Sequence, residues 1–101
     1  TGRWIEVEEA ARWGLVNHVY PGASLMEEAR KLAKHLADGP PLVFSAIKEI
    51  VREAEDMTFQ DAMNRITKRQ FETVDKLYGS EDNKEGYTAF AEGRDPVWKG
   101  R

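Results

Sequence analysis

The stretch that decides the fold is SEDNKEGYTAFAEGRDPVWKGR, residues 80–101. Ser80 is a good N-cap residue, because its hydroxyl can accept a hydrogen bond from a free backbone N–H of the first helical turn. The sequence therefore predicts a helix over 81–92, and Pro96 ends helical structure because it disfavours the helical conformation in the residue before it. Gly86 lies inside this helix, where glycine costs about 1 kcal/mol relative to alanine. A close approach of another group would explain its presence.

The rest of the chain is also predicted to be helical. Apolar residues recur at helical spacing, and glycine and proline residues mark the ends of the apolar stripes. The predicted helices cover residues 6–13, 24–38, 42–54 and 58–77, and residues 15–20 are predicted to be extended. The fold class is thus all-α, with about five helices and one short extended segment.

The helix predicted over 58–77 has a weak point in its apolar stripe. Gln70 interrupts the stripe near the middle, and Phe71 stands just beside it. This pattern predicts that the second half of the helix packs on something other than the core of this chain.

Composition limits the classes of protein. The 101 residues carry 33% charged side chains, a net charge of −3 and no cysteine. A nucleic-acid-binding protein needs a one-sided basic surface, and a membrane span needs about 18 consecutive apolar residues. Neither pattern occurs, so we expect one domain over 1–101 that binds no nucleic acid and no membrane. Without a starting Met or a signal peptide, the chain is expected to be a cytoplasmic fragment that begins within a longer protein.

The residue types that carry catalysis give no catalytic or metal site. The acidic pairs are predicted to lie on solvated helix faces or in first turns, where carboxylates favour the helix dipole. These pairs are Glu8/Glu9, Glu27/Glu28, Glu49/Glu53 and Glu81/Asp82. His18 and His35 stand apart with no metal-ligand spacing, so we predict no metal. Trp98 is predicted to be an interface anchor, because it lies in a tail that cannot bury it locally.

Two terminal motifs carry a family resemblance. The opening TGRWIEVEEAARWGLVN, residues 1–17, and the pattern E-D-x-x-E-G-x-x-A-F, residues 81–90, resemble the C-terminal region of the crotonase superfamily of enoyl-CoA hydratases and isomerases. The tail at 94–101 is most similar to the carnitinyl-CoA dehydratase branch. The resemblance implies a C-terminal helical (trimerisation) domain, with the N-terminal catalytic domain upstream of Thr1.

The resemblance also implies a function for the parent protein. It would be a lyase of the enoyl-CoA hydratase or carnitinyl-CoA dehydratase type that acts on acyl-CoA thioesters, with no cofactor beyond the coenzyme A of its substrate. This segment would cover the substrate, build a homo-oligomer (a trimer or a dimer of trimers in the family) and have no activity by itself. The alternatives are an enoyl-CoA isomerase of the same superfamily and a stand-alone helical protein-interaction domain.

The resemblance implies two substrate-binding residues, Phe90 and Arg94. In family hexamers the C-terminal helix of one subunit lies near the CoA nucleotide bound by a neighbour. An aromatic residue, and a basic residue three positions later, contact the adenine and the 3′-phosphate there. The aromatic position corresponds to Phe90, but the basic position corresponds to Gly93, which has no side chain. Arg94 is the nearest basic candidate. The alternative is a structural Phe90 and a surface Arg94.

Overall fold

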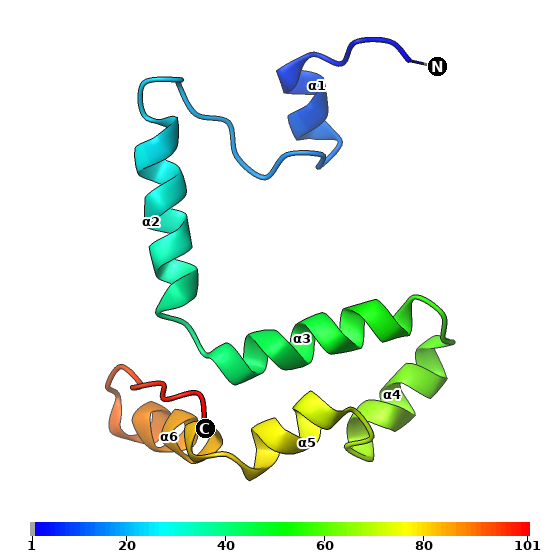
Figure 1. Ribbon diagram of the computed structural model, residues 1–101, viewed down its shortest axis with the longest axis vertical. Helices are drawn as coiled ribbons and strands as arrows, with labels where there is room; N and C mark the ends of the chain where they lie inside the picture. Colours follow the sequence, from blue (N-terminus) through cyan, green and yellow to red (C-terminus); the bar gives the residue numbers. More distant parts are fainter. Residues whose placement is uncertain (1) are drawn as a thin grey trace. The chain divides into compact units, whose positions relative to one another are not determined.

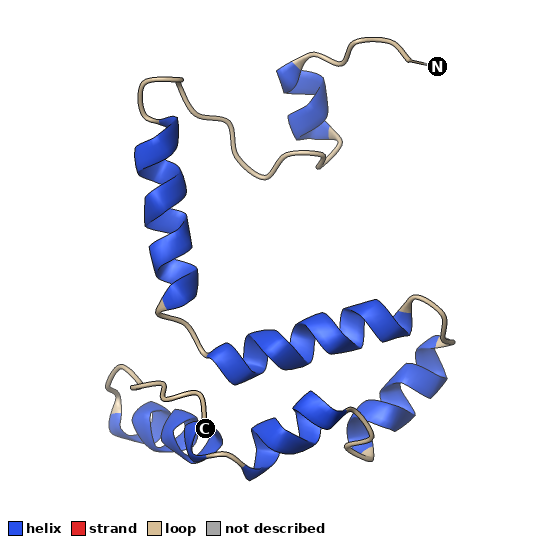
Figure 2. Ribbon diagram, viewed as in Figure 1, coloured by secondary structure: helices blue, strands red, loops and turns tan. Residues whose placement is uncertain are grey.

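The computed structural model describes residues 2–101, and these residues form six helices without a strand (Figure 1, Figure 2). The helices are α1 (Val7–Arg12), α2 (Leu25–Ala37), α3 (Pro41–Ala54), α4 (Phe59–Thr67), α5 (Glu72–Gly79) and α6 (Glu81–Glu92). The predicted all-α class is confirmed. The segment predicted to be extended, residues 15–20, is loop, and the helix predicted over 58–77 is divided into α4 and α5.

The chain divides into two compact units, with the boundary between Leu36 and Ala37. The first unit contains α1 and nearly all of α2, and neither helix has a buried residue. Leu25, Leu32 and Leu36 of α2 are each about half exposed. This unit therefore presents apolar side chains that its own residues leave largely uncovered.

The second unit has a small core between α3 and α5, which lie side by side (Figure 1). The buried residues at its centre are Ala46, Phe71 and Val74. Ile50, Ile66 and Leu77 pack around them and are partly buried. Because Phe71 and Val74 belong to the second half of the 58–77 segment, the prediction that this half packs outside the chain's own core is wrong.

The break between α4 and α5 explains this difference. Arg69 adopts a left-handed backbone conformation with φ of 52°, and the N–H of Gln70 donates to the carbonyl of Arg65 over 2.9 Å. This turn ends α4 and redirects the chain, so that Phe71 enters the core at the N-cap of α5 with 1% of its surface exposed. Burial of a phenylalanine side chain contributes about 1.5–3 kcal/mol, which offsets the roughly 1–2 kcal/mol cost of one left-handed residue.

Two carboxylates of α3 bind the neighbouring helices. Glu49 accepts hydrogen bonds from the N–H of Thr73 over 2.9 Å and from the Thr73 hydroxyl, which lowers the pKa of Glu49. Glu53 forms an ion pair of 2.8 Å with Arg65 of α4. The prediction that this acidic pair lies on a solvated face is therefore wrong, because both side chains join α3 to other elements.

The last helix begins and ends where the sequence predicts. The Ser80 hydroxyl accepts a hydrogen bond from the N–H of Asn83 over 3.0 Å, as an N-cap residue does. Gly93 ends α6 with φ of 66°, a conformation that glycine adopts at little cost. Residues 94–101, which we call the tail, follow this turn.

Candidate functional site

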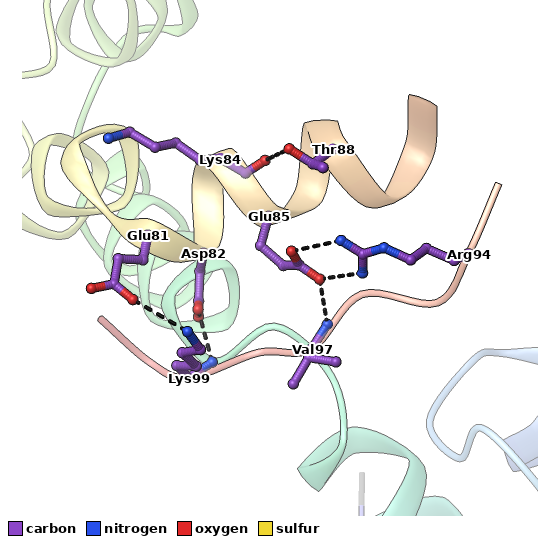
Figure 3. Close-up of a pocket in the computed structure, with 8 residues that line it drawn as sticks. All are labelled: Glu81, Asp82, Lys84, Glu85, Thr88, Arg94, Val97 and Lys99. Carbon is purple, nitrogen blue, oxygen red and sulfur yellow. Dashed lines mark hydrogen bonds and ion pairs between the residues drawn. The ribbon is translucent and has the colours of Figure 1, made fainter. Parts of the chain in front are cut away.

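The tail runs back along α6 and is bound there by Asp82 (Figure 3). The two carboxylate oxygens of Asp82 accept backbone hydrogen bonds from Lys99 over 2.8 Å and from Gly100 over 2.9 Å. The N–H of Asp82 donates to the carbonyl of Arg101 over 3.1 Å. Asp82 lies in the first turn of α6, as predicted, but it is only 3% exposed and is therefore not solvated.

Glu85 binds the tail one helical turn further on (Figure 3). Its carboxylate accepts two hydrogen bonds from the Arg94 guanidinium, over 2.5 and 2.9 Å, and one from the N–H of Val97 over 2.9 Å. Because Arg94 and then Val97 stabilise the charged form, the pKa of Glu85 falls to about 2. Arg94 also donates to Glu92 over 2.6 Å, and both carboxylates raise the pKa of Arg94.

Trp98 packs on α6 at Gly86. A Cβ atom added at Gly86 would lie 3.4 Å from the outer edge of the Trp98 ring. The Trp98 ring therefore packs on α6 at the position where the sequence predicts a close approach of another group. Trp98 is half-buried, so the expectation that the tail cannot bury it locally is wrong.

An apolar groove with a volume of about 520 Å³ opens beside this contact. The residues that line it are Pro40, Leu42, Val43, Leu77, Tyr78, Asp82, Asn83, Gly86, Tyr87, Phe90 and Trp98. Phe90 is 89% exposed and Tyr87 is 67% exposed. Two aromatic rings on α6 are thus available to a planar apolar ligand. Phe90 lies four residues after Gly86, where Trp98 packs.

A separate polar pocket of about 500 Å³ lies between α6 and the tail (Figure 3). It is lined by Glu81, Asp82, Lys84, Glu85, Thr88, Arg94, Val97 and Lys99. Its carboxylates bind the chain's own N–H groups and cations, including the Glu81 ion pair of 3.5 Å with Lys99. The pocket is therefore the contact surface of the tail.

The two residues predicted to bind substrate have different surroundings. Phe90 lines the apolar groove and is almost fully exposed. Arg94 lines the polar pocket, where Glu85 and Glu92 bind its guanidinium. Phe90 and Arg94 therefore line two different pockets. Gly93, which lies between them in the sequence, is the left-handed residue that ends α6.

Sequence reasoning missed Asp82 and Glu85 as the residues that bind the tail, and it missed Tyr87 as a groove residue. One signal was present: Asp82 and Glu85 are three residues apart, and Gly86 and Phe90 are four apart, which places each pair on one helix face. Asp82 is also four residues before Gly86, so it lies on the helix face on which Trp98 packs.

Residues 2–101 contain no cluster of three or more histidine or acidic side chains that could bind a metal ion. None of the helices described within this range combines the length and the apolar character that crossing a membrane requires.

The six helices and the bound tail define this chain as an all-helical region, and comparison with known proteins gives its family. The enoyl-CoA hydratase/isomerase family matches residues 1–101, the full range. The chain therefore belongs to the enoyl-CoA hydratase/isomerase family, as its two terminal motifs predict.

Among curated proteins, the chain is similar to carnitinyl-CoA dehydratases. The protein from Escherichia coli strain SMS-3-5 is 46% identical over 101 residues, which are 100% of this chain and 39% of the relative. The protein from Salmonella heidelberg strain SL476 has the same identity and coverage. The predicted similarity to this branch is confirmed, and the chain spans 39% of the length of these relatives, in their C-terminal part.

Solved structures give the same assignment. An enoyl-CoA hydratase of Geobacillus kaustophilus is 37% identical with a TM-score of 0.84, covering 99% of this chain and 36% of that one. An enoyl-CoA hydratase of Bacillus anthracis is 29% identical with a TM-score of 0.83, covering 99% of this chain and 37% of that one. The fold is that of the helical C-terminal domain of crotonase-family proteins.

Proposed function

We propose that the complete protein is a lyase of the enoyl-CoA hydratase type, acting on acyl-CoA thioesters, with a carnitinyl-CoA dehydratase-like reaction as the leading candidate. The observation that carries this proposal is the 46% identity to carnitinyl-CoA dehydratases along the whole of this chain. An isomerase of the same superfamily is the alternative, and the reaction product distinguishes the two. A cytoplasmic location stays a prediction.

We expect the catalytic groups to lie outside residues 1–101. General acid–base catalysis works best with a pKa near the operating pH. The pKa values of Glu49 and Glu85 are lowered by the hydrogen bonds that they accept, so both carboxylates are poor bases near neutral pH. This supports a segment that shapes the enzyme without performing its chemistry.

The role proposed for this segment is to cover the substrate and to build contacts between subunits of a homo-oligomer. The exposed leucines of α2 support this role, because burying one such side chain contributes about 1.5–3 kcal/mol. A surface of this kind is stabilised when the rest of the protein, or a second subunit, covers it. Oligomer contacts of the family type stay a prediction.

We further propose that Phe90 contacts the adenine of the acyl-CoA substrate. Its 89% exposure and its place in the apolar groove support this, because an aromatic ring can stack on a planar base. Arg94 is the proposed phosphate contact. To reach a phosphate it has to give up part of its binding to Glu85 or Glu92, so we expect the smaller contribution from Arg94.

The test of the proposed function is turnover by the complete protein. We expect hydration of crotonobetainyl-CoA or crotonyl-CoA, with the hydroxyacyl product identified by mass spectrometry. A product of unchanged mass with a shifted double bond would establish the isomerase alternative. Turnover by residues 1–101 alone, above a heat-treated control, would contradict the placement of the catalytic groups outside this segment.

A further inference from the structure

The tail is bound through its backbone on both sides of Trp98. The N–H of Val97 donates to Glu85, and the N–H of Lys99 donates to Asp82. Hydrogen bonds to a charged carboxylate are shorter and about twice as strong as those between neutral groups. Because the residues before and after Trp98 are both held, the position of the Trp98 backbone on α6 is set by these two carboxylates.

The side chain of Trp98 then forms one side of the apolar groove. The ring lies against Gly86, one helical turn beyond Asp82 and next to Glu85. Phe90 lines the same groove, and its position four residues after Gly86 places it on the same helix face. Helix α6 supplies Tyr87 and Phe90 to this groove, and the tail supplies Trp98, whose position depends on the groups that bind the tail.

We propose that Asp82 and Glu85 are positioning residues for the apolar groove, which takes the planar purine end of an acyl-CoA. They bind the tail so that Trp98 completes the groove in which Phe90 contacts the base. This inference rests on the proposed function, since it assigns the ligand through Phe90. Asp82 and Glu85 act through the tail and do not themselves touch the ligand.

The experiment replaces Asp82 in the complete protein, in a background where every other tryptophan, including Trp4 and Trp13, is changed to Phe so that Trp98 gives the fluorescence. Asp82→Asn removes the charge and one acceptor. We expect acrylamide quenching of Trp98 to increase severalfold without ligand, and the Kd for coenzyme A, measured by calorimetry, to rise severalfold. The KM for acyl-CoA rises with it, while kcat stays nearly unchanged, as expected for lost binding that is equal in ground and transition states.

Glu72→Gln is the matched control. Glu72 is an exposed carboxylate in the first turn of α5, its replacement makes the same change in charge, and it lines neither the apolar groove nor the polar pocket. We expect both quenching and the Kd to stay at their unmodified values. Asp82→Glu keeps both acceptor oxygens and should recover part of the binding that Asp82→Asn loses.

Two further variants keep the test decisive if Asp82→Asn does not fold. Trp98→Ala leaves the carboxylates and the backbone hydrogen bonds in place, and we expect it to weaken coenzyme A binding severalfold. Trp98→Phe keeps a flat ring and should retain most of the affinity. Equal affinity of the Ala and Phe variants would overturn the role of the Trp98 ring.

The failure of this inference differs from failure of the proposed function. If Phe90→Ala leaves the Kd for coenzyme A unchanged, the purine contact of the proposed function is wrong. If Phe90→Ala weakens coenzyme A binding, the purine contact of the proposed function stands. If Asp82→Asn then exposes Trp98 without raising the Kd for coenzyme A, the positioning role is overturned. Unchanged Trp98 quenching in folded Asp82→Asn also overturns it.

Discussion

The guanidinium of Arg65 lies over the ring of Phe71, with 4.3 Å between the Arg65 Cζ atom and the ring centroid. Phe71 is 1% exposed, and Arg65 also forms an ion pair with Glu53. A cation over an aromatic face contributes about 0.5–2 kcal/mol. Phe71 is thus packed by α3 on one side and covered by a paired cation on another, which makes it the residue on which the second unit depends most.

Phe71→Ala is expected to destabilise the protein by about 3–5 kcal/mol, because it removes a large side chain from a packed core. Thermal unfolding of the complete protein measures the effect. Phe59→Ala is the matched control, since Phe59 is 80% exposed in the same unit. An equal fall in Tm for the two variants would show that the core is elsewhere.

Phe90→Ala is expected to raise the KM for acyl-CoA severalfold and to leave kcat nearly unchanged, because it removes a contact remote from the reacting atoms. Steady-state kinetics of the complete enzyme gives both values, and Phe59→Ala serves again as an exposed phenylalanine on another helix. An unchanged KM with a lowered Tm would make Phe90 a structural residue.

Acid is expected to release the tail as Glu85 is protonated. The pKa of Glu85 is lowered in the folded protein, from 4.5 to about 2, so its contribution to stability is full above pH 4.5 and is lost as the pH falls toward 2. Trp98 fluorescence across this range, in the background without the other tryptophans, measures the release. Two further charged groups face this ion pair: Glu92 faces Arg94, and Lys99 faces Glu85.

Glu85→Gln tests this assignment. This variant removes the titrating group, so we expect the tail to be loosened already at neutral pH. The change in Trp98 fluorescence between pH 4.5 and 2 should then be smaller. Glu92→Gln keeps the contacts of Glu85 with Arg94 and Val97 and should keep most of the transition. A transition that persists in full without Glu85 would assign it to another carboxylate.

Gly86→Ala is expected to be tolerated, and Gly86→Leu is expected to displace Trp98. The added Cβ would meet Trp98 at 3.4 Å, the near end of ordinary contact, and alanine favours the helix by about 1 kcal/mol over glycine. A leucine side chain extends into the space that the Trp98 ring fills. Tm and Trp98 quenching measure the two effects, and displacement of Trp98 by alanine would contradict this packing.

Leu32→Asp on α2 is expected to shift the complete protein toward smaller species in sedimentation velocity, because it places a charge among apolar side chains proposed to lie at a subunit contact. Arg30→Asp is a control on the same helix that leaves the leucines unchanged. A lowered Tm without dissociation would show that the rest of the same chain covers α2 instead.

The sequence predicts α6 well and the α4–α5 break poorly, for a physical reason. The ends of α6 depend on Ser80 and Gly93, whose effects act within one helical turn. The break depends on Arg69, a residue that rarely adopts positive φ, and on the gain from burying Phe71 against α3. That gain comes from tertiary packing, which helical periodicity does not contain.

The sequence likewise predicts one part of the candidate site and not the other. The sequence could predict that Gly86 receives a neighbouring group and that Phe90 lies on the same face. It could not predict that Asp82 is buried, because the partners of Asp82 are backbone N–H groups 17 and 18 residues away. Such donors are the same at almost every position and leave no mark in the residue pattern.

This use of backbone donors determines how freely the tail can diverge during evolution. Any residue with an N–H can stand at position 97 or 99 and still be held by α6, so only proline is excluded by the hydrogen bonds themselves. Gly100 is more restricted, because its φ is 73°, a backbone conformation that residues with a side chain rarely adopt. Homologous tails can therefore differ at their exposed side chains while α6 keeps them on the same path.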